Sequence, residues 1–267
     1  MPFEVSENFR QNWGGEPDFD ELMSLDGEVY RQVARRKTFK FSINDKDYFA
    51  KIHRGVGWAE IIKNLAQGRL PVLGASNEYE AINALTRLGI KTMTLAAYGQ
   101  RGKNVAELES FVITESLEPS ISLEDFCVDW VTEKRPLQLK RALINSVAAI
   151  TRRLHQNGIN HRDLYICHFL LKETDLAKQL NPSELPLYLI DLHRVQIRSK
   201  TPQRWLAKDL AALYFSAMDI GLTSRDLYRF IRAYTNNKLR AELAENGLLW
   251  ESVERKALAL KAKPIKG

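Results

Sequence analysis

The stretch GINHRDLYICHFLL, Gly158–Leu171, decides how the rest of the chain is interpreted. Its polar centre, His161-Arg162-Asp163, follows a predicted long helix that ends in glycine and precedes a predicted apolar strand, CHFLLK. A triplet alone can occur by chance, but its place between a helix and a strand makes it more specific. Asp163 is the candidate general base.

The order of these residues matches a phosphotransferase loop. In the catalytic loop of protein kinases, H-R-D-L-x-x-x-N, the aspartate is the base and the asparagine is a metal ligand. His161 to Leu164 fit this order, and His168 stands where the asparagine is expected. A neutral imidazole nitrogen can ligate a metal. His168 is therefore a metal ligand, a hydrogen-bond partner of Asp163, Asp191 or phosphate, or a buried packing residue.

Sequence patterns typical of strands occupy most of the first half of the chain. Apolar and polar residues alternate there, as in half-buried strands. The predicted strands are Glu28–Val33, Thr38–Ile43, Asp47–His53, Thr92–Gly99 and Ser110–Thr114. Two predicted helices interrupt them: Trp58–Gln67, ended by Gly68 and Pro71, and Asn77–Gly89, with Asn77 as its N-cap.

The sequence of the second half predicts mainly helices. Ser122 is predicted to cap a short helix, a long helix follows Pro136, and the chain is predicted to be helical almost throughout from Trp205. A strand-rich half before a helical half indicates an α+β arrangement in two lobes. We therefore predict a bilobal protein-kinase-like fold, with a strand-rich N-lobe at 1–114 and a mainly helical C-lobe at 115–267.

Phosphoryl transfer also needs a cation on the phosphates and a carboxylate that holds this cation. Lys51, in YFAKI on the third predicted strand, matches the strand lysine of kinases. Glu78 opens a following helix, where the partner glutamate is expected, and Glu80 is its rival. Because these two glutamates are two residues apart, they face different sides of the helix and only one can meet Lys51.

Two further aspartates complete the ordered set. Asp191 ends the apolar strand LYLID and matches the metal-binding aspartate of D-F-G, here written Asp191-Leu192-His193. Asp209, in WLAKDLAALYF, is predicted to brace the backbone of the catalytic loop. The order of strand lysine, helix glutamate, HRD and strand-terminal aspartate is what predicts the kinase-like fold.

The chain departs from protein kinases in two places. VARRKT, Val33–Thr38, has no glycine where a glycine-rich loop should cover the phosphates, so basic side chains such as Arg35 and Arg36 are expected to contact them. Only thirteen residues separate Asp191 from Trp205, and no A-P-E follows. The acceptor is therefore expected to be a small molecule or the sugar of a glycolipid.

Composition narrows the class of protein further. The chain has 267 residues, 45% of them hydrophobic, and a net charge of +6, which suits phosphorylated ligands, an anionic membrane or an acidic protein partner. No aromatic-rich basic motif supports nucleic-acid binding, which we do not expect. The two cysteines form no C-x-x-C pair, which argues against a zinc site. The N-terminal stretch has no apolar segment typical of a signal peptide, so we expect a cytoplasmic protein.

Four long and unusual strings point to a family: RLPVLGASNEYEAI (Arg69–Ile82), GINHRDLYICHFLL (Gly158–Leu171), LIDLHRVQIR (Leu189–Arg198) and KDLAALYFSAMDIGLT (Lys208–Thr223). They resemble the lipopolysaccharide core heptose(I) kinase family of Gram-negative bacteria. The resemblance covers about Gly27 to Tyr234. It implies lipopolysaccharide biosynthesis: transfer of phosphate from ATP, with Mg²⁺, to a hydroxyl of the first heptose of the inner core.

The resemblance also implies site residues. Asp163 matches the catalytic aspartate of the family, and Lys51, Glu78 and Asp191 match its nucleotide and metal positions. We place Glu115, at the expected junction of the lobes, in the ATP site as well. The family shares the histidine at the asparagine position and the glycine-poor hairpin.

The implied acceptor is anchored by lipid A at the inner face of the inner membrane. A predicted helix has one apolar face with basic residues beside it: Trp58, Ile61, Ile62 and Leu65, with Lys63 and Arg69. This helix either contacts the membrane peripherally or packs on the first lobe. The basic C-terminal stretch WESVERKALALKAKPIKG could meet anionic lipid, an acidic carrier protein, or only solvent.

Two other interpretations stay open at the level of sequence. The chain could be a protein kinase, although no platform for a protein substrate is evident. It could also be a catalytically weak nucleotide-binding scaffold, because His168 replaces the asparagine and the glycines are absent.

Overall fold

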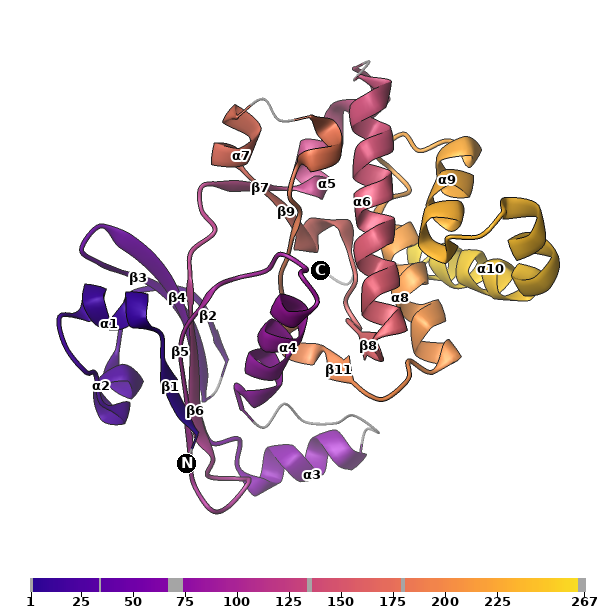
Figure 1. Cartoon of the computed structure of the whole chain (residues 1–267). Coiled ribbons are helices and arrows are strands. Elements are labelled where there is room, and N and C mark those ends of the chain that lie inside the picture. Colours follow the sequence, from indigo (N-terminus) through magenta and orange to yellow (C-terminus); the bar gives the residue numbers. More distant parts are fainter. Residues whose placement is uncertain (1, 34, 67–73, 134–135, 179–180, 264–267) are drawn as a thin grey trace. The chain divides into compact units, whose positions relative to one another are not determined.

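The computed structural model describes residues 2–33, 35–66, 74–133, 136–178 and 181–263. The chain forms two compact units (Figure 1). Unit 1 comprises Met1–Ala84, Thr92–Leu117 and Leu192–Arg194, and unit 2 comprises Leu85–Lys91, Glu118–Asp191 and Val195–Gly267. Unit 1 is rich in strands and unit 2 is mainly helical, which confirms the α+β class.

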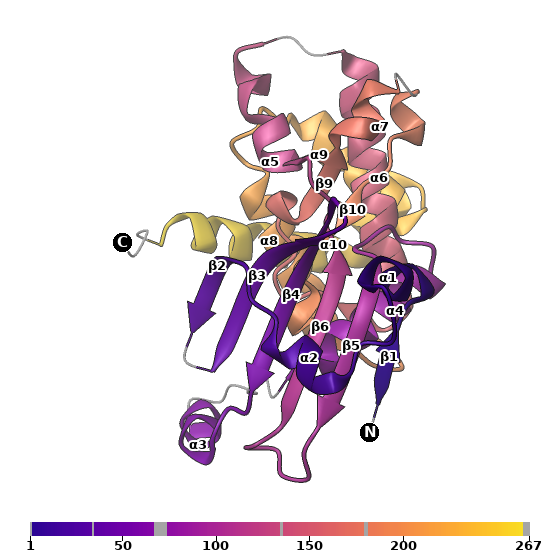
Figure 2. The ribbon, with the colours of Figure 1, turned by 90° about the vertical axis from the view of Figure 1, so that its left-hand side faces the viewer.

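Unit 1 contains a six-stranded antiparallel sheet in the order β1-β5-β6-β4-β3-β2 (Figure 2). Its strands are β1 (Phe3–Val5), β2 (Glu28–Val33), β3 (Arg36–Ile43), β4 (Lys46–Arg54), β5 (Leu95–Arg101) and β6 (Glu109–Glu115). Five of them overlap the predicted strands, with the largest shift at β5, which begins at Leu95 where Thr92 was predicted. The short strand β1 was not predicted, because three residues cannot display a periodic pattern.

Alternation along β3 and β4 sorts their side chains onto two faces. One face belongs to a buried cluster that includes Phe39, Phe41, Tyr48, Ala50 and Ile52. Phe9 of α1 (Glu7–Trp13) and Leu22 of α2 (Phe19–Ser24) join this cluster. Lys51 lies on the opposite face, so the packing of the sheet determines where the lysine points.

The two predicted helices of unit 1 are α3 (Trp58–Ala66) and α4 (Ser76–Arg87). The prediction of Asn77 as N-cap was wrong, because α4 already begins at Ser76. Asn77 instead donates from Nδ2 to the backbone oxygen of His193 at 2.7 Å. The predicted stop at Gly68 and Pro71, and the basic residue Arg69, lie outside the described residues.

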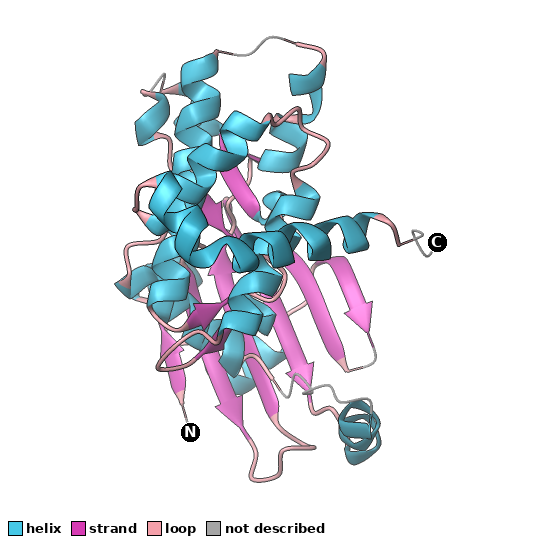
Figure 3. Cartoon of the chain, turned by 90° about the vertical axis from the view of Figure 1, so that its right-hand side faces the viewer, coloured by secondary structure: helices cyan, strands magenta, loops and turns pink. Residues whose placement is uncertain are grey.

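Unit 2 is mainly helical (Figure 3). Its α-helices are α5 (Leu123–Phe126), α6 (Leu137–Gln156), α7 (Glu173–Ala177), α8 (Gln203–Ser216), α9 (Ser224–Thr235) and α10 (Leu239–Lys261). The predicted cap of α5 is confirmed, since Ser122 Oγ accepts the backbone N–H of Asp125 at 3.1 Å. A buried cluster including Ala148, Leu210, Tyr234 and Val253 joins α6, α8, α9 and α10.

Short strands in unit 2 frame the polar loops that carry the HRD triplet and Asp191. They are β7 (Ser120–Ser122), β8 (Ile159–Asn160), β9 (Phe169–Lys172), β10 (Tyr188–Leu189) and β11 (Gln196–Ile197). The HRD triplet lies between β8 and β9, and Asp191 lies between β10 and β11. Because β8 pairs with β11 and β9 pairs with β10, both ends of the two loops are tied together.

The close approach of β8 and β11 requires glycine at position 158. Gly158 has φ +75°, and a Cβ there would lie 1.7 Å from the backbone oxygen of Arg198. Any side chain would both strain the backbone and push the strand pair apart. Among the described residues, none of the helices is long and apolar enough to cross a bilayer.

Candidate active site

Lys51 and Glu78 form an ion pair in unit 1. Lys51 Nζ donates to Glu78 Oε1 at 2.7 Å and to Oε2 at 3.0 Å. Glu78 lies in the first turn of α4 and is only 3% exposed, whereas Glu80 is exposed. The structure therefore pairs Lys51 with the first of the two glutamates that the sequence offered. Two charge-assisted hydrogen bonds fix the ammonium group at this point of the sheet.

The sheet face around Lys51 also carries Arg36 and a buried histidine. The register places Arg36 opposite His53 and His53 opposite Ser110, one row from Lys51. Burial lowers the pKa of His53 to about 4, and the neighbouring positive charges act in the same direction. His53 is therefore neutral at pH 7, and Arg36 and Lys51 supply positive charge on this face.

Arg35 and Arg36 leave the strand on opposite faces. The backbone N–H of Arg54 donates to the oxygen of Arg35 at 2.9 Å, which extends the pairing of β3 and β4 by one residue. Successive residues of a strand alternate between faces, so Arg35 starts from the face opposite Lys51. Of the two arginines expected at the phosphates, Arg36 is the one on the lysine face.

An aromatic pair accompanies Lys51 on the same face. Phe49 precedes Lys51 by two residues, and Tyr30 of β2 meets Phe49 edge to face with ring centroids 5.1 Å apart. The two-residue period of the strand is the sequence signal that places Phe49 on the same face as Lys51. The expected ATP residue Glu115 uses its carboxylate elsewhere, because Oε1 accepts from Lys46 Nζ at 2.5 Å.

The catalytic loop of unit 2 is held by Asp209. This carboxylate is fully buried in α8 and accepts the backbone N–H of His161 at 2.6 Å and that of Arg162 at 2.9 Å. The residue that follows these two N–H groups is Asp163. The two hydrogen bonds to Asp209 therefore fix the backbone immediately before Asp163 and so the position of its side chain.

Asp209 is itself oriented by a buried relay that the sequence analysis missed. His155 Nε2 donates to Asp209 Oδ2 at 3.3 Å, and His155 Nδ1 is hydrogen-bonded to the Tyr234 hydroxyl at 2.8 Å. Burial raises the pKa of Tyr234, so its hydroxyl stays a donor. No local pattern links these positions, since Tyr234 lies 79 residues from His155.

Asp191 is positioned by the residue before it. The backbone N–H of Ile190 donates to the oxygen of His168 at 3.0 Å, and His161 Nε2 donates to the oxygen of Ile190 at 3.0 Å. Burial lowers the pKa of His161, which favours the neutral ring. The histidine of the HRD triplet thus ties the catalytic loop to the Asp191 strand.

The geometry of His168 determines which of its nitrogens carries the proton. His168 Nδ1 lies 2.7 Å from the backbone oxygen of Asp163, and a carbonyl oxygen can only accept. Nδ1 is therefore the donor to this oxygen, and the tautomer with the proton on Nδ1 has its lone pair on Nε2. Nε2 lies 3.6 Å from Asp191 Oδ2, which is too long for a hydrogen bond but suits two atoms that share a cation.

Backbone strain also concentrates in this region. Five non-glycine residues among those described have positive φ, and Asn44, Asp45 and Asn236 are explained by a two-residue hairpin turn and a helix C-cap. The other two are Arg162, with φ 74°, and Asp191, with φ 60°. Such strain typically gathers at functional sites, where the surrounding structure enforces it.

The side chains in unit 2 fit a magnesium ion that also binds phosphate. Among the described residues, no three His, Cys, Asp or Glu side chains gather to hold a metal by themselves. Mg²⁺ is commonly bound by one or two carboxylates together with substrate phosphates and waters. The Asp191 carboxylate with the lone pair of His168 Nε2 provides such a partial set, with one oxygen and one nitrogen.

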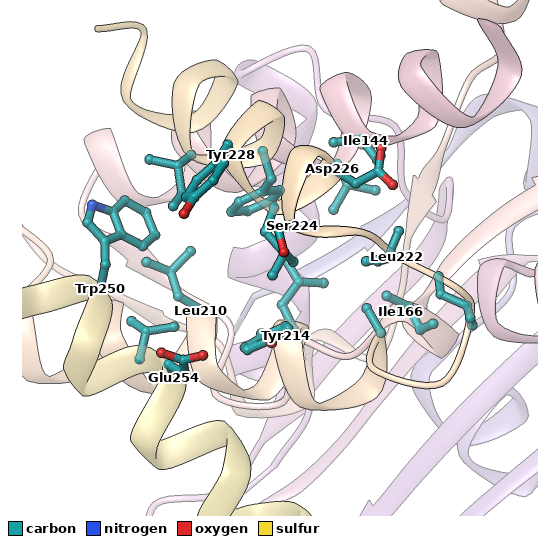
Figure 4. A pocket seen from close by; sticks show the side chains of 18 of the residues that line it. Ile144, Ile166, Leu210, Tyr214, Leu222, Ser224, Asp226, Tyr228, Trp250 and Glu254 are labelled. Carbon is teal, nitrogen blue, oxygen red and sulfur yellow. The ribbon is translucent and has the colours of Figure 1, made fainter. Parts of the chain in front are cut away.

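A second feature of unit 2 is an apolar cavity of about 520 Å³ (Figure 4). Its walls come from α6, α8, α9 and α10, with Leu210, Tyr214 and Trp250 among the lining side chains. Lys140 and Asp226 also line it and pair at 2.8 Å. The sequence analysis did not predict this cavity.

Comparison with known proteins shows close relatives over nearly the whole chain. Residues 20–234 match the lipopolysaccharide kinase (Kdo/WaaP) family. The lipopolysaccharide core heptose(I) kinase WaaP of Pseudomonas aeruginosa is 48% identical over 257 residues, which are 96% of this chain and 95% of that protein. The corresponding protein of Escherichia coli K12 is 47% identical over 247 residues, 92% of each chain.

A solved structure gives the same result in three dimensions. It is described as WaaP in complex with acyl carrier protein, and it matches with a TM-score of 0.83 at 44% identity, over 97% of this chain and 99% of that one. The matched family range contains the Lys51–Glu78 pair, the braced HRD loop, His168 and Asp191. The chain therefore belongs to the lipopolysaccharide kinase (Kdo/WaaP) family.

Proposed function

We propose that this chain transfers the γ-phosphate of ATP to a hydroxyl of the first heptose of the lipopolysaccharide core, at the cytoplasmic side of the inner membrane. The observation that carries the proposal is the HRD loop, braced by buried Asp209, in a chain 48% identical to a heptose(I) kinase. The fold alone would not support a substrate, since one fold hosts many functions.

In this proposal, each group of side chains has one task. Lys51, held by Glu78, binds phosphate oxygens of ATP, and Arg36 adds positive charge on the same face. The Asp163 carboxylate accepts the proton of the heptose hydroxyl. At the same time the hydroxyl oxygen bonds to the γ-phosphorus, and the bond from the γ-phosphorus to the leaving oxygen of ADP breaks. Asp191 and His168 Nε2 would hold Mg²⁺, which would supply positive charge that neutralises the transferring phosphate.

The proposal favours a sugar acceptor over a protein. Only thirteen residues separate Asp191 from Trp205, and part of this segment is already used by the 3₁₀ turn Leu192–Arg194 and by β11. A long activation loop that could align a peptide has no room there. The scaffold interpretation is not favoured either, because His168 keeps a lone pair for a cation.

We also propose that the chain binds an acidic acyl carrier protein. The support is the related structure with that partner, together with the apolar cavity of unit 2. An acyl carrier protein presents a fatty acyl chain, and an apolar cavity is the environment that such a chain requires. The net charge of +6 favours association with an acidic protein.

Changing Lys51 to Met should raise the KM for ATP and lower kcat/KM at least about tenfold, or 1.4 kcal/mol of transition-state stabilisation. The reason is the loss of the ammonium group that contacts phosphate. Glu78→Gln should reproduce part of this loss, and Glu80→Gln, on the exposed side of α4, should stay within about twofold. Steady-state kinetics with purified core glycolipid measure this. A sensitive Glu80 with a silent Glu78 would contradict the pairing.

Changing Asp163 to Ala should lower kcat about 10²- to 10⁴-fold and leave ATP affinity nearly unchanged, because a general base acts in the transition state. Transfer of labelled phosphate to core glycolipid gives the rate, and calorimetric titration with ATP gives the affinity. Asp129→Ala, an exposed aspartate of unit 2, is the matched control. Turnover at the wild-type rate in Asp163→Ala would refute the proposed function.

Changing His168 to Ala should cost at least about tenfold in rate and raise the Mg²⁺ concentration needed for half-maximal activity. His168→Asn restores an oxygen ligand, which Mg²⁺ prefers, and should recover more activity with Mg²⁺ than with Mn²⁺. Metal titrations of both variants measure this, with Cys167→Ser as the neighbouring control. Unchanged metal dependence in His168→Ala would leave His168 only a structural role.

Filling the apolar cavity should abolish recognition of the acyl chain. Gly247 lines the cavity, and a Cβ built there meets no atom within 4 Å, so Gly247→Phe can enter it. Long-chain acyl carrier protein should raise the Tm of the wild type more than the unacylated carrier does. Gly247→Phe should remove this difference, and Gly247→Ala should keep it. Equal stabilisation by both carriers in the wild type would refute the acyl site.

A further inference from the structure

A hollow lined by cations lies at one end of the sheet of unit 1. It has a volume of about 260 Å³ and lies where β2, β3 and β4 meet at the hairpin end. Four basic side chains, Arg35, Arg36, Lys37 and Arg54, line it against one acidic side chain, Asp26. Asp26 is already paired with Lys37 at 2.5 Å, so the hollow keeps an excess of positive charge.

Exposed apolar side chains belong to the helix that follows this end of β4. Arg54 ends β4, and α3 begins only four positions later at Trp58 (Figure 2). Trp58 is 54% exposed and Ile62 is 62% exposed, while Ile61 is 6% exposed and holds the helix to unit 1. Residues four apart share one side of a helix, so Trp58 and Ile62 form one outward face. The sequence analysis placed Ile61 on that same face, and its burial corrects this.

Cations beside an exposed tryptophan and isoleucine match the chemistry of an anionic bilayer surface. Acidic headgroups attract Lys and Arg near the surface, and tryptophan and aliphatic side chains enter the interface between headgroups and acyl chains. A soluble anion would use only the hollow and leave Trp58 and Ile62 in water. A membrane surface uses both features at once.

We propose that the hairpin end of unit 1 is a membrane-docking surface, in which Trp58 and Ile62 enter the interface and the hollow around Arg35 and Arg54 takes the phosphate of an anionic lipid. The proposal deepens the proposed function and rests on it, because the acceptor of that reaction is anchored in a bilayer. The same hairpin carries Arg36 on the Lys51 face and Arg35 on the other face. Docking would therefore bring the phosphate-binding face of the sheet close to the membrane surface.

The test uses the full chain and vesicles of phosphatidylcholine, alone or with 30% phosphatidylglycerol, in co-sedimentation. Wild type should bind the anionic vesicles at least about tenfold more tightly than the neutral ones, and added salt should weaken this binding. Trp58→Ser with Ile62→Asn should lose at least about tenfold in binding. Arg35→Gln should lose about fivefold, since one cation near the surface contributes about a factor of five. Val128→Ser with Val131→Ser, where both valines are 65% exposed in unit 2, should bind as the wild type does.

Three outcomes would contradict the proposed membrane-docking surface. The Tm of the Trp58/Ile62 double variant should stay within a few degrees of the wild type, and a large drop would show that the face packs internally. If the Trp58/Ile62 double variant binds vesicles as the wild type does but no longer binds acyl carrier protein, the surface is a protein interface and the proposal is overturned. Binding of both vesicle types with equal affinity would overturn the headgroup site.

Activity distinguishes failure of this inference from failure of the proposed function. With a water-soluble, deacylated core acceptor, the Trp58/Ile62 double variant should turn over at the wild-type rate. With acceptor embedded in anionic vesicles, it should be at least about tenfold slower. If wild type phosphorylates neither acceptor, the proposed function fails. If wild type phosphorylates both and the variant is equally fast on vesicles, only the docking surface fails.

Discussion

The buried carboxylate of Asp209 is the constraint on which the catalytic region of unit 2 depends. Its two oxygens accept the consecutive N–H groups of His161 and Arg162, and this supports the positive φ of Arg162. An unpaired buried carboxylate would be costly, so the carboxylate and the loop need each other. Asp163 and the histidine of the HRD triplet take their places from that arrangement. His155 and Tyr234 extend it to the helices that also surround the apolar cavity.

In the proposed function, unit 1 binds phosphate without a glycine-rich loop. In place of close backbone N–H groups, its hairpin offers side-chain cations. The alternation of the strand divides the starting points of these cations between two faces, with Arg36 on the lysine face and Arg35 on the opposite face, and both line the hollow. This division is a consequence of the two-residue period and needs no special backbone conformation.

Much of the fold could be predicted because its elements are local. The alternation in TFKFSI and DYFAKIH predicted β3 and β4 within a few residues of their observed bounds. The long helix predicted between Pro136 and Gly158 corresponds to α6. The prediction missed β1, α1 and α2, whose short segments show no clear period. The N-cap at Asn77 was wrong because the asparagine side chain bonds to a distant backbone oxygen, that of His193, and this partner is invisible in the local sequence.

The sequence by itself determined which residue types stand at the site and in what order: a strand lysine, a helix glutamate, the HRD triplet and a strand-terminal aspartate. It left open which glutamate pairs with Lys51, which nitrogen of His168 carries a proton, and which arginine faces the nucleotide. Only the tertiary structure decided these points, because they depend on contacts between residues far apart in the chain. Asp209 lies 48 residues from His161, Tyr234 lies 79 from His155, and Glu78 lies 27 from Lys51. A local pattern sets the periodicity of one segment, but the partner of a side chain is set by how segments pack.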